Sequence, residues 1–208
     1  MKTFILMLIL FTFSFSLDVA FGVMCYKCEG RNTDTCTGEK HQCPEGSVCM
    51  TVSQLDVYNG TYHSVQRRCS LNLPCNTTQY AFTNENTTFD IVTTCCEGDL
   101  CNDGPFQMPE IPIVKKGYEC PVCFSVDIKL CTAKRNTTCR NESDKCGEFV
   151  GVFKKPDGVE LNFTAQGCVS HHVCTHDFSQ LIGWYVQSTK DFRCYDPKKN
   201  PSLEYSEE

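Results

Sequence analysis

Cysteine and histidine are the residues through which this chain could do chemistry, because they supply redox pairs and metal ligands. Cysteines number 18 among the 208 residues. C-x-x-C spacings begin at Cys25 and at Cys120, and such a pair can carry thiol–disulfide redox chemistry. The stretch HHVCTH combines Cys174 with His171, His172 and His176, and such a set can bind Zn²⁺. No paired carboxylates and no Ser/His/Asp set stand out from the background.

The first residues of the chain indicate export, which decides how cysteine is used. Lys2 precedes an apolar run over residues 4–15, and small residues follow in A-F-G, where a signal peptidase reads them. We expect residues 1–22 to be removed, so that the mature chain begins near Val23. The apolar run is too short to span a bilayer, and the C-terminal DPKKNPSLEYSEE lacks the hydrophobic tail of a lipid-anchor signal. The sequence predicts a secreted, extracellular protein with no membrane anchor.

The amino-acid composition is typical of proteins from an oxidising compartment. The cysteine content lies in the range of disulfide scaffolds, and an even number of cysteines allows nine bridges. The net charge is −6 at pH 7, and no basic stripe runs along the chain. Nucleic acid and anionic membrane surfaces are therefore poor partners, and we expect a protein partner.

Asparagine supplies a further chemical signal, the N-x-S/T acceptor of glycosylation. Several such acceptors in an exported chain predict surface glycans. The six acceptors are Asn59, Asn76, Asn86, Asn136, Asn141 and Asn162. Asn200 is not a seventh, because Pro201 follows it.

An internal repeat reveals the units that must position these residues. Eight cysteines from Cys25 to Cys95 recur from Cys120 to Cys194, with an offset of 95 residues at the start and 99 at the end. The chain is therefore one module used twice. Only the first module has the additional pair Cys96 and Cys101.

Each module contains a central hairpin pattern. Side chains alternate on either side of Asn59-Gly60, a favoured two-residue turn, and around the Pro-Asp-Gly of residues 156–158. No stretch shows helical periodicity over a useful length, so the sequence predicts an all-β chain. Modules of this size bury too little apolar surface for secure core packing. Bridges, typically worth about 2 to 4 kcal/mol each, must contribute heavily.

The cysteine pattern resembles a known family. The C-x-x-C opening, a hairpin between the fifth and sixth cysteines and the closing CCEGDLCN are similar to the three-finger domain of lymphocyte antigens and the urokinase receptor, the LU domain. The resemblance covers essentially all of the mature chain and implies two tandem disulfide-rich three-finger domains. The expected division is a signal peptide at 1–22, domain 1 at 23–103, a proline-containing linker at 104–118, domain 2 at 119–196 and a polar tail at 197–208.

The resemblance also implies a disulfide pairing. The implied pairs are Cys25–Cys49, Cys28–Cys36, Cys43–Cys69, Cys75–Cys95 and Cys96–Cys101 in domain 1, and Cys120–Cys146, Cys123–Cys131, Cys139–Cys168 and Cys174–Cys194 in domain 2. Adjacent Cys95 and Cys96 then close the third finger and a small C-terminal loop, respectively. Asn102 is expected to hydrogen-bond main-chain groups of the disulfide knot. Domain 2 lacks the last bridge, so the residues after Cys194 are expected to be looser.

The implied disulfide pairing indicates whether these cysteines serve as redox pairs, as metal ligands or as structural bridges. Both C-x-x-C pairs fit it, and neither opens a strand–helix unit, so we expect no redox site. Cys174 belongs to the framework and the three histidines fall on one short loop, so we interpret HHVCTH as a solvated polar loop. We expect no enzyme, no catalytic residue, no metal and no cofactor, and a function in binding.

The stretch between the modules is the candidate binding segment. It is apolar, and its prolines favour an extended, stiff backbone that loses little entropy on docking. The candidate partner-binding residues are Phe106, Met108, Pro109, Ile111, Pro112 and Ile113. A competing interpretation is that these side chains cement the two domains, and a third is a contact between subunits.

A narrower resemblance suggests the partner. Two modules without an anchor, a second module without its last bridge, the stretch GCVSHHVC and the linker GPFQMPEIPIVKKGYEC resemble the gamma-type phospholipase A2 inhibitors. This resemblance implies a secreted protein that inhibits a secreted phospholipase A2 through a noncovalent complex, and that self-associates. The alternative is a secreted ligand or decoy in a cell-surface receptor pathway, including reproductive signalling.

Overall fold

Strands make up nearly all of the regular structure. The computed structural model describes residues 22–57, 60–71, 75–84, 87–106, 108–109, 117–126, 131–154, 158–175 and 185–201. The prediction of an all-β chain is confirmed, since the one helix within these ranges is the five-residue α2 (His171–Thr175). None of the described residues belongs to a helix long and apolar enough to cross a membrane.

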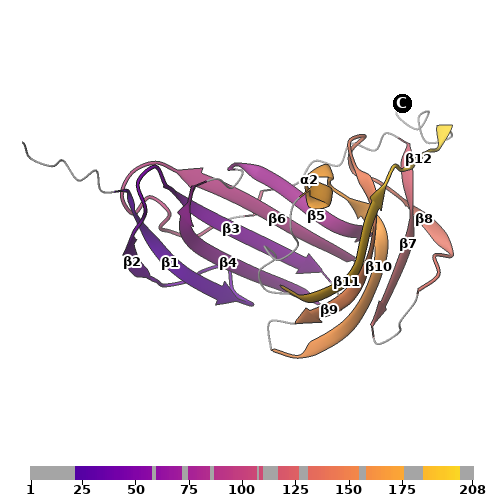
Figure 1. The fold of residues 1–208 in the computed structure, drawn as a ribbon, viewed down its shortest axis with the longest axis horizontal. Helices are drawn as coiled ribbons and strands as arrows, with labels where there is room; N and C mark the ends of the chain where they lie inside the picture. Colours follow the sequence, from indigo (N-terminus) through magenta and orange to yellow (C-terminus); the bar gives the residue numbers. More distant parts are fainter. Residues whose placement is uncertain are drawn as a thin grey trace, which may run out of the picture.

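The first domain consists of three antiparallel hairpins, β1–β2, β3–β4 and β5–β6 (Figure 1). The central strand β3 pairs with β4 on one side and with β6 on the other, and accordingly none of its residues is exposed. β1 pairs first with β2 and then, from Cys28 onward, with β4. The strands are β1 (Met24–Arg31), β2 (Glu39–Gln42), β3 (Val48–Val57), β4 (Thr61–Ser70), β5 (Thr77–Asn84) and β6 (Thr87–Cys96).

The second domain repeats this plan with one replacement. β7 pairs with β8 and β10, and β9 pairs with β10 and β11. The helix α2 occupies the place in the chain that β5 has in the first domain, and Figure 1 shows α2 beside β5. The strands are β7 (Tyr118–Val126), β8 (Arg135–Thr138), β9 (Lys145–Lys154), β10 (Glu160–Val169), β11 (Tyr185–Tyr195) and β12 (Lys198–Lys199).

The two central hairpins predicted from the sequence are confirmed, with one difference in loop length. Val57 pairs with Thr61 in the first domain, and Lys154 pairs with Glu160 in the second. The paired ends of the first hairpin therefore enclose the three residues 58–60, so the predicted two-residue turn is wrong. Gly60 has a φ of 141°, a backbone conformation that only glycine adopts easily.

Nine disulfides join cysteines within the same domain, and no cysteine is free. The pairs are Cys25–Cys49, Cys28–Cys36, Cys43–Cys69, Cys75–Cys95, Cys96–Cys101, Cys120–Cys146, Cys123–Cys131, Cys139–Cys168 and Cys174–Cys194. They are the pairs that the family resemblance implies. Each domain thus has a buried cluster of cysteines at one end of its fingers.

Asn102 forms hydrogen bonds to main-chain groups beside the disulfide cluster of the first domain, as the family resemblance implies. The main-chain N–H of Tyr26 donates to Asn102 Oδ1 at 2.9 Å. Asn102 Nδ2 donates to the carbonyls of Tyr26 at 3.0 Å and Met50 at 3.4 Å. The side chain is buried, and its amide satisfies main-chain groups of two strands at once.

Noncovalent contacts close the second domain where the last bridge is missing. Lys145 Nζ lies 2.5 Å from Asp196 Oδ1. β12 pairs with β7, and beyond it the Asn200 N–H donates to the carbonyl of Gly117 while Asn200 Nδ2 donates to Glu119 Oε1 at 3.0 Å. The polar tail predicted after Asp196 therefore begins, in the structure, with a strand that is held against the domain.

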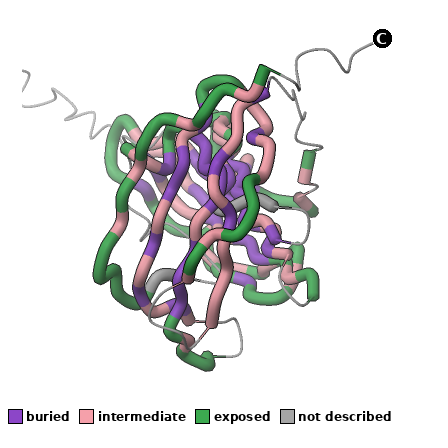
Figure 2. The backbone as a smooth tube through the Cα atoms, turned by 90° about the vertical axis from the view of Figure 1, so that its right-hand side faces the viewer, coloured by how far each residue is buried: buried purple, intermediate pink, exposed green. Residues whose placement is uncertain are grey.

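The main hydrophobic core lies between the two domains and takes residues from both. Its buried members are Met50, Val52, Ala81, Phe89 and Ile91 from the first domain and Phe149, Phe153, Phe163, Ala165, Val169 and Val173 from the second. Figure 2 shows this buried interior enclosed by exposed outer strands and loops. The sheets of the two domains also meet directly, because β10 pairs with β5 at Cys168 and Thr83. The domains consequently form one body.

Candidate functional site

Phe89 is the central apolar contact across the domain boundary. It lies on β6, is fully buried, and its ring centroid is 5.9 Å from that of Phe153 and 6.2 Å from those of Phe124 and Phe163. All three of these partners belong to the second domain. Phe163 in turn packs against Phe124 at 4.3 Å and against Phe153 at 4.5 Å. Such aromatic clusters contribute both buried area and favourable edge-to-face geometry.

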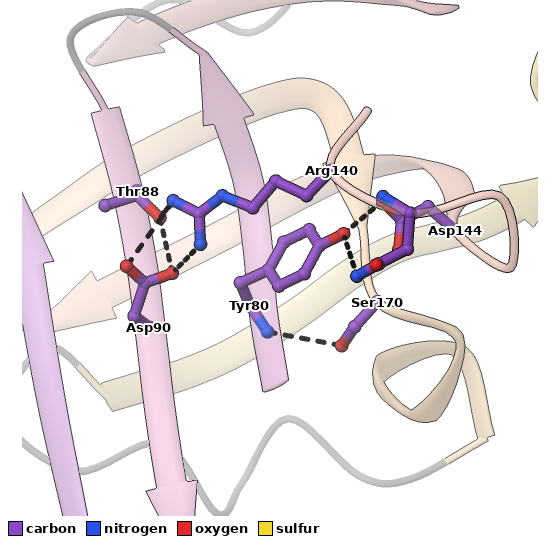
Figure 3. Close-up of polar contacts among 7 residues, drawn as sticks. Tyr80, Thr88, Asp90, Arg140, Asp144 and Ser170 are labelled. Atoms are coloured by element: carbon purple, nitrogen blue, oxygen red, sulfur yellow. Dashed lines mark hydrogen bonds and ion pairs between the residues drawn. The ribbon is translucent and has the colours of Figure 1, made fainter. Parts of the chain in front are cut away.

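A polar contact beside this cluster is centred on Tyr80 (Figure 3). Tyr80 extends from β5 with only 2% of its surface exposed, and its hydroxyl donates to Asp144 Oδ2. The main-chain N–H of Tyr80 donates to Ser170 Oγ at 3.2 Å, and its carbonyl accepts from the Ser170 N–H at 2.9 Å. One residue of the first domain is thereby bonded to two separate segments of the second.

Burial sets the protonation of this pair. Burial, and after it the neighbouring Asp144 carboxylate, raises the pKa of Tyr80 above its ordinary range. Burial also raises the pKa of the Asp144 carboxyl, although hydrogen bonds from Tyr80 and from the Asn141 main chain oppose the rise. The Tyr80 hydroxyl therefore remains a donor at neutral and mildly alkaline pH.

An ion pair forms the second polar contact between the domains. Arg140 Nη1 lies 2.7 Å from Asp90 Oδ1, and Arg140 Nη2 donates to Thr88 Oγ1 at 3.1 Å (Figure 3). The side chains of Arg140 and Asp90 are 11% and 9% exposed. The guanidinium carbon also lies 4.7 Å from the centroid of the Tyr80 ring, within reach of a cation–π interaction. Two nearly buried charges thus neutralise each other at the boundary.

The linker predicted to bind a partner is only partly described. Phe106 and Met108 are half-buried and Pro109 is exposed, whereas Ile111, Pro112 and Ile113 lie outside the described residues. The predicted contact of these six residues with a partner therefore stays a prediction. Among the described residues, contacts that join the domains come from β5 and β6 of the first domain, and Met50 and Val52 of β3 belong to the shared core.

Arg67 fixes the beginning of the linker. Its side chain is almost fully buried, and its Nη1 donates to the carbonyl of Cys36 at 3.1 Å. Nη2 donates to the carbonyl of Gly104, and the Asp103 carboxylate lies 3.6 Å from Nη1. This arginine ties the first finger to the start of the linker, a role that no local sequence pattern indicates.

The cysteine and histidine candidates are used structurally. Cys25 and Cys28 bond to Cys49 and Cys36 and not to each other, and the C-x-x-C of the second domain is divided in the same way. The sequence HHVCT, interpreted as a loop, forms α2, with Val173 buried and Cys174 in a disulfide. His171 and His172 are exposed on this helix, and His176 lies outside the described residues.

The described glycosylation acceptors fall into two groups. Asn76, Asn136 and Asn162 are exposed, whereas Asn141 is half-buried at the domain boundary. Asn59 and Asn86 lie outside the described residues. Whether any of the six acceptors carries a glycan remains a prediction.

A crevice of about 620 Å³ opens where β1 leaves β2 and joins β4. Sequence reasoning did not identify it, because it forms only when β4 joins the hairpin of β1 and β2. Its charged lining is mixed, with Lys27, Lys40, Arg67 and Arg68 facing Glu29 and Glu39. Glu29 is paired with Arg31 at 2.6 Å, and Arg67 with Asp103, so much of this charge is neutralised locally.

Comparison with known proteins agrees with this architecture. A model of the u-PAR/Ly-6 domain matches residues 22–104 and 116–200. The chain is 28% identical over 153 residues to phospholipase A2 inhibitor CNF of Crotalus durissus terrificus, an alignment that covers 70% of this chain and 73% of that protein.

Two further relatives are similarly distant. Ly6/PLAUR domain-containing protein 8 of Bos taurus is 26% identical over 160 residues, which cover 73% of this chain and 66% of that protein. A gamma-type phospholipase A2 inhibitor chain of Laticauda semifasciata is 26% identical over 102 residues, which cover 49% of this chain and 55% of that protein.

Proposed function

Because the chain belongs to the u-PAR/Ly-6 domain family, we propose that it is a secreted binding protein that inhibits a secreted phospholipase A2 through a noncovalent complex. The observation that carries this proposal is the similarity to two proteins named as phospholipase A2 inhibitors. One of these alignments spans 153 residues, more than either matched domain, so the likeness extends over both domains.

The docked domains support binding by a preformed surface. Phe89, Tyr80 and Arg140 hold the two domains together, so a partner that touches both would not first have to order them. Preorganisation of this kind lowers the entropic cost of association. All cysteines are in disulfides, so no thiol is available for a covalent bond to the target.

The linker is the proposed contact within this surface. Its start is fixed at Gly104 by the buried Arg67, and the half-buried Phe106 and Met108 follow within four residues. Aromatic residues and methionine are enriched in the buried cores of protein interfaces, which makes Phe106 and Met108 suitable contacts. Self-association through the same segment is a further proposal.

The second candidate function is a secreted ligand or decoy in a cell-surface receptor pathway. It rests on the family alone, because the relative Ly6/PLAUR domain-containing protein 8 aligns over a similar share of this chain and its name mentions no phospholipase A2.

A pull-down separates the two functions. The glycosylated protein is immobilised, exposed to body fluid, and the recovered proteins are identified by mass spectrometry, with the reduced and alkylated chain as control. Recovery of a secreted phospholipase A2, whose hydrolysis of micellar phospholipid falls as the protein is added, supports inhibition. Recovery of a receptor ectodomain without any phospholipase would overturn the proposal in favour of the second function.

A further inference from the structure

Asn141 differs from the other described glycosylation acceptors in its surroundings. Its Nδ2 lies 3.4 Å from the Tyr80 hydroxyl, which belongs to the first domain. Its main-chain N–H donates to Asp144 Oδ2 at 2.8 Å, and its carbonyl accepts from the Asp144 N–H at 3.3 Å. The acceptor asparagine thus starts a short turn that is pressed against the first domain.

The chemistry of N-glycosylation takes place on this same nitrogen. The anomeric carbon of the glycan bonds to Asn Nδ2, which gives up one proton, and the lipid pyrophosphate that carried the glycan leaves. The product has a bulky, hydrated substituent on Nδ2. At Asn76, Asn136 and Asn162 the side chain is exposed, so the substituent can extend into solvent.

At Asn141 the substituent meets the docked first domain. The ring of Tyr80 is buried, and both of its main-chain groups are bonded to Ser170, so Tyr80 cannot move aside alone. Arg140, the preceding residue, is held by Asp90 at 2.7 Å, which fixes the position of the turn from its other side. A glycan that replaces the Nδ2 hydrogen directed at the Tyr80 hydroxyl therefore requires β5 to separate from the second domain.

We propose that glycosylation of Asn141 and docking of the two domains exclude each other, so that the docked protein carries Asn141 unmodified. A chain that receives a glycan there before its domains meet stays open. This inference rests on passage of the chain through the secretory pathway, and it is independent of the target that the protein binds.

The experiment compares two full-length variants expressed in a glycosylating secretory cell line. S143T retains a complete acceptor sequence at Asn141, whereas S143A removes the acceptor and leaves Asn141 itself in place. Ser143 is exposed, so neither change disturbs the boundary. Site occupancy is read by glycopeptide mass spectrometry, and docking is read by hydrogen exchange of the Tyr80 amide, which bonds to Ser170 of the second domain.

The expected result is that S143T molecules with a glycan on Asn141 have faster Tyr80 exchange than S143A. If S143T carries no glycan at Asn141 although Asn136 and Asn162 are occupied, docking precedes modification, and the added substitution F89A must then restore occupancy. The proposal is overturned if glycosylated S143T matches S143A in Tyr80 exchange, or if F89A fails to restore occupancy of an empty site.

Discussion

Asp144 is a titratable residue of the second domain that accepts a hydrogen bond from Tyr80 of the first domain, so its titration bears on docking. Its pKa is raised by burial, so the folded state retains a proton at pH values where the unfolded state has released it. The contribution of this group to stability is therefore largest below its ordinary value of 3.8 and is lost as the pH rises through the folded pKa.

We accordingly predict that the wild-type protein gains stability relative to D144N as the pH is lowered toward 3.8. Urea unfolding of both proteins between pH 3 and 7 measures the difference. D196N is the matched control with the opposite sign, because Lys145 lowers the pKa of Asp196, whose contribution is lost as the pH falls. If the unfolding free energies of wild type and D144N change with pH by the same amount over this range, the raised pKa of Asp144 is contradicted.

Asn102 provides a prediction about the disulfide knot. N102A leaves the N–H and carbonyl of Tyr26 and the carbonyl of Met50 without their partner in a buried site. We expect a loss of roughly 2 to 4 kcal/mol in the unfolding free energy, from the usual cost of unsatisfied buried groups. Urea unfolding measures it, and D99A, which removes one exposed bond to Met24, serves as control and should cost much less. Equal losses in the two variants would argue against the role of Asn102.

Sequence reasoning succeeds at the residue scale where a motif fixes the environment. The role of Asn102 could be predicted, because the resemblance of the closing CCEGDLCN to the three-finger family implies it. Tyr80 and Asp144 could not, because they lie 64 positions apart and nothing in their neighbours indicates that they meet. Such contacts depend on how the two domains dock, which no local pattern specifies.

At the scale of elements, the cluster of Phe89 with Phe124, Phe153 and Phe163 leads to a prediction about docking of the domains. F89A removes the fully buried ring that β6 inserts among Phe124, Phe153 and Phe163. Phe→Ala changes in cores cost about 3 to 5 kcal/mol, and here we expect the loss to appear as separation of the domains, because each domain keeps its own disulfides. Small-angle scattering should show a more extended molecule, whereas L71A, at an exposed position, should leave the profile unchanged. A compact F89A protein would refute this role.

The strand β12 carries a prediction about the C-terminal end. Cleavage by trypsin after Lys198 or Lys199 requires β12 to detach from β7. N200A removes the side-chain bond to Glu119, so we expect faster release of the C-terminal peptide during limited proteolysis, followed by mass spectrometry. L71A, at an exposed position of the first domain, is the control. Unaltered cleavage rates in N200A would show that β12 is held by other contacts.

The elements themselves were largely predictable. Alternating side chains around turn residues indicate the two central hairpins, although the first loop is longer than predicted, and the cysteine repeat indicates the modules that contain them. The exception is α2, because a single helical turn has no periodicity to detect. Its position depends on tertiary contacts, namely burial of Val173 and the Cys174–Cys194 disulfide.

At the scale of the whole molecule, the two domains share one hydrophobic core, and Arg67 holds the start of the linker at Gly104. The proposed inhibitor uses Phe106 and Met108 as apolar anchors on that surface. The rival contact is the hairpin tip of the second domain, where Val159 is 50% exposed. These two sites can be separated by substitution, since neither includes a disulfide.

The decisive measurement is the affinity of a secreted phospholipase A2 for the wild-type protein, the linker variant F106S/M108S, V159S and the exposed control L71S, determined by calorimetry. We predict that the linker variant binds about 2 to 4 kcal/mol more weakly and that V159S and L71S bind like wild type. Undiminished affinity in a folded F106S/M108S protein would contradict the linker as the contact, and no binding by the wild-type protein would contradict inhibition itself.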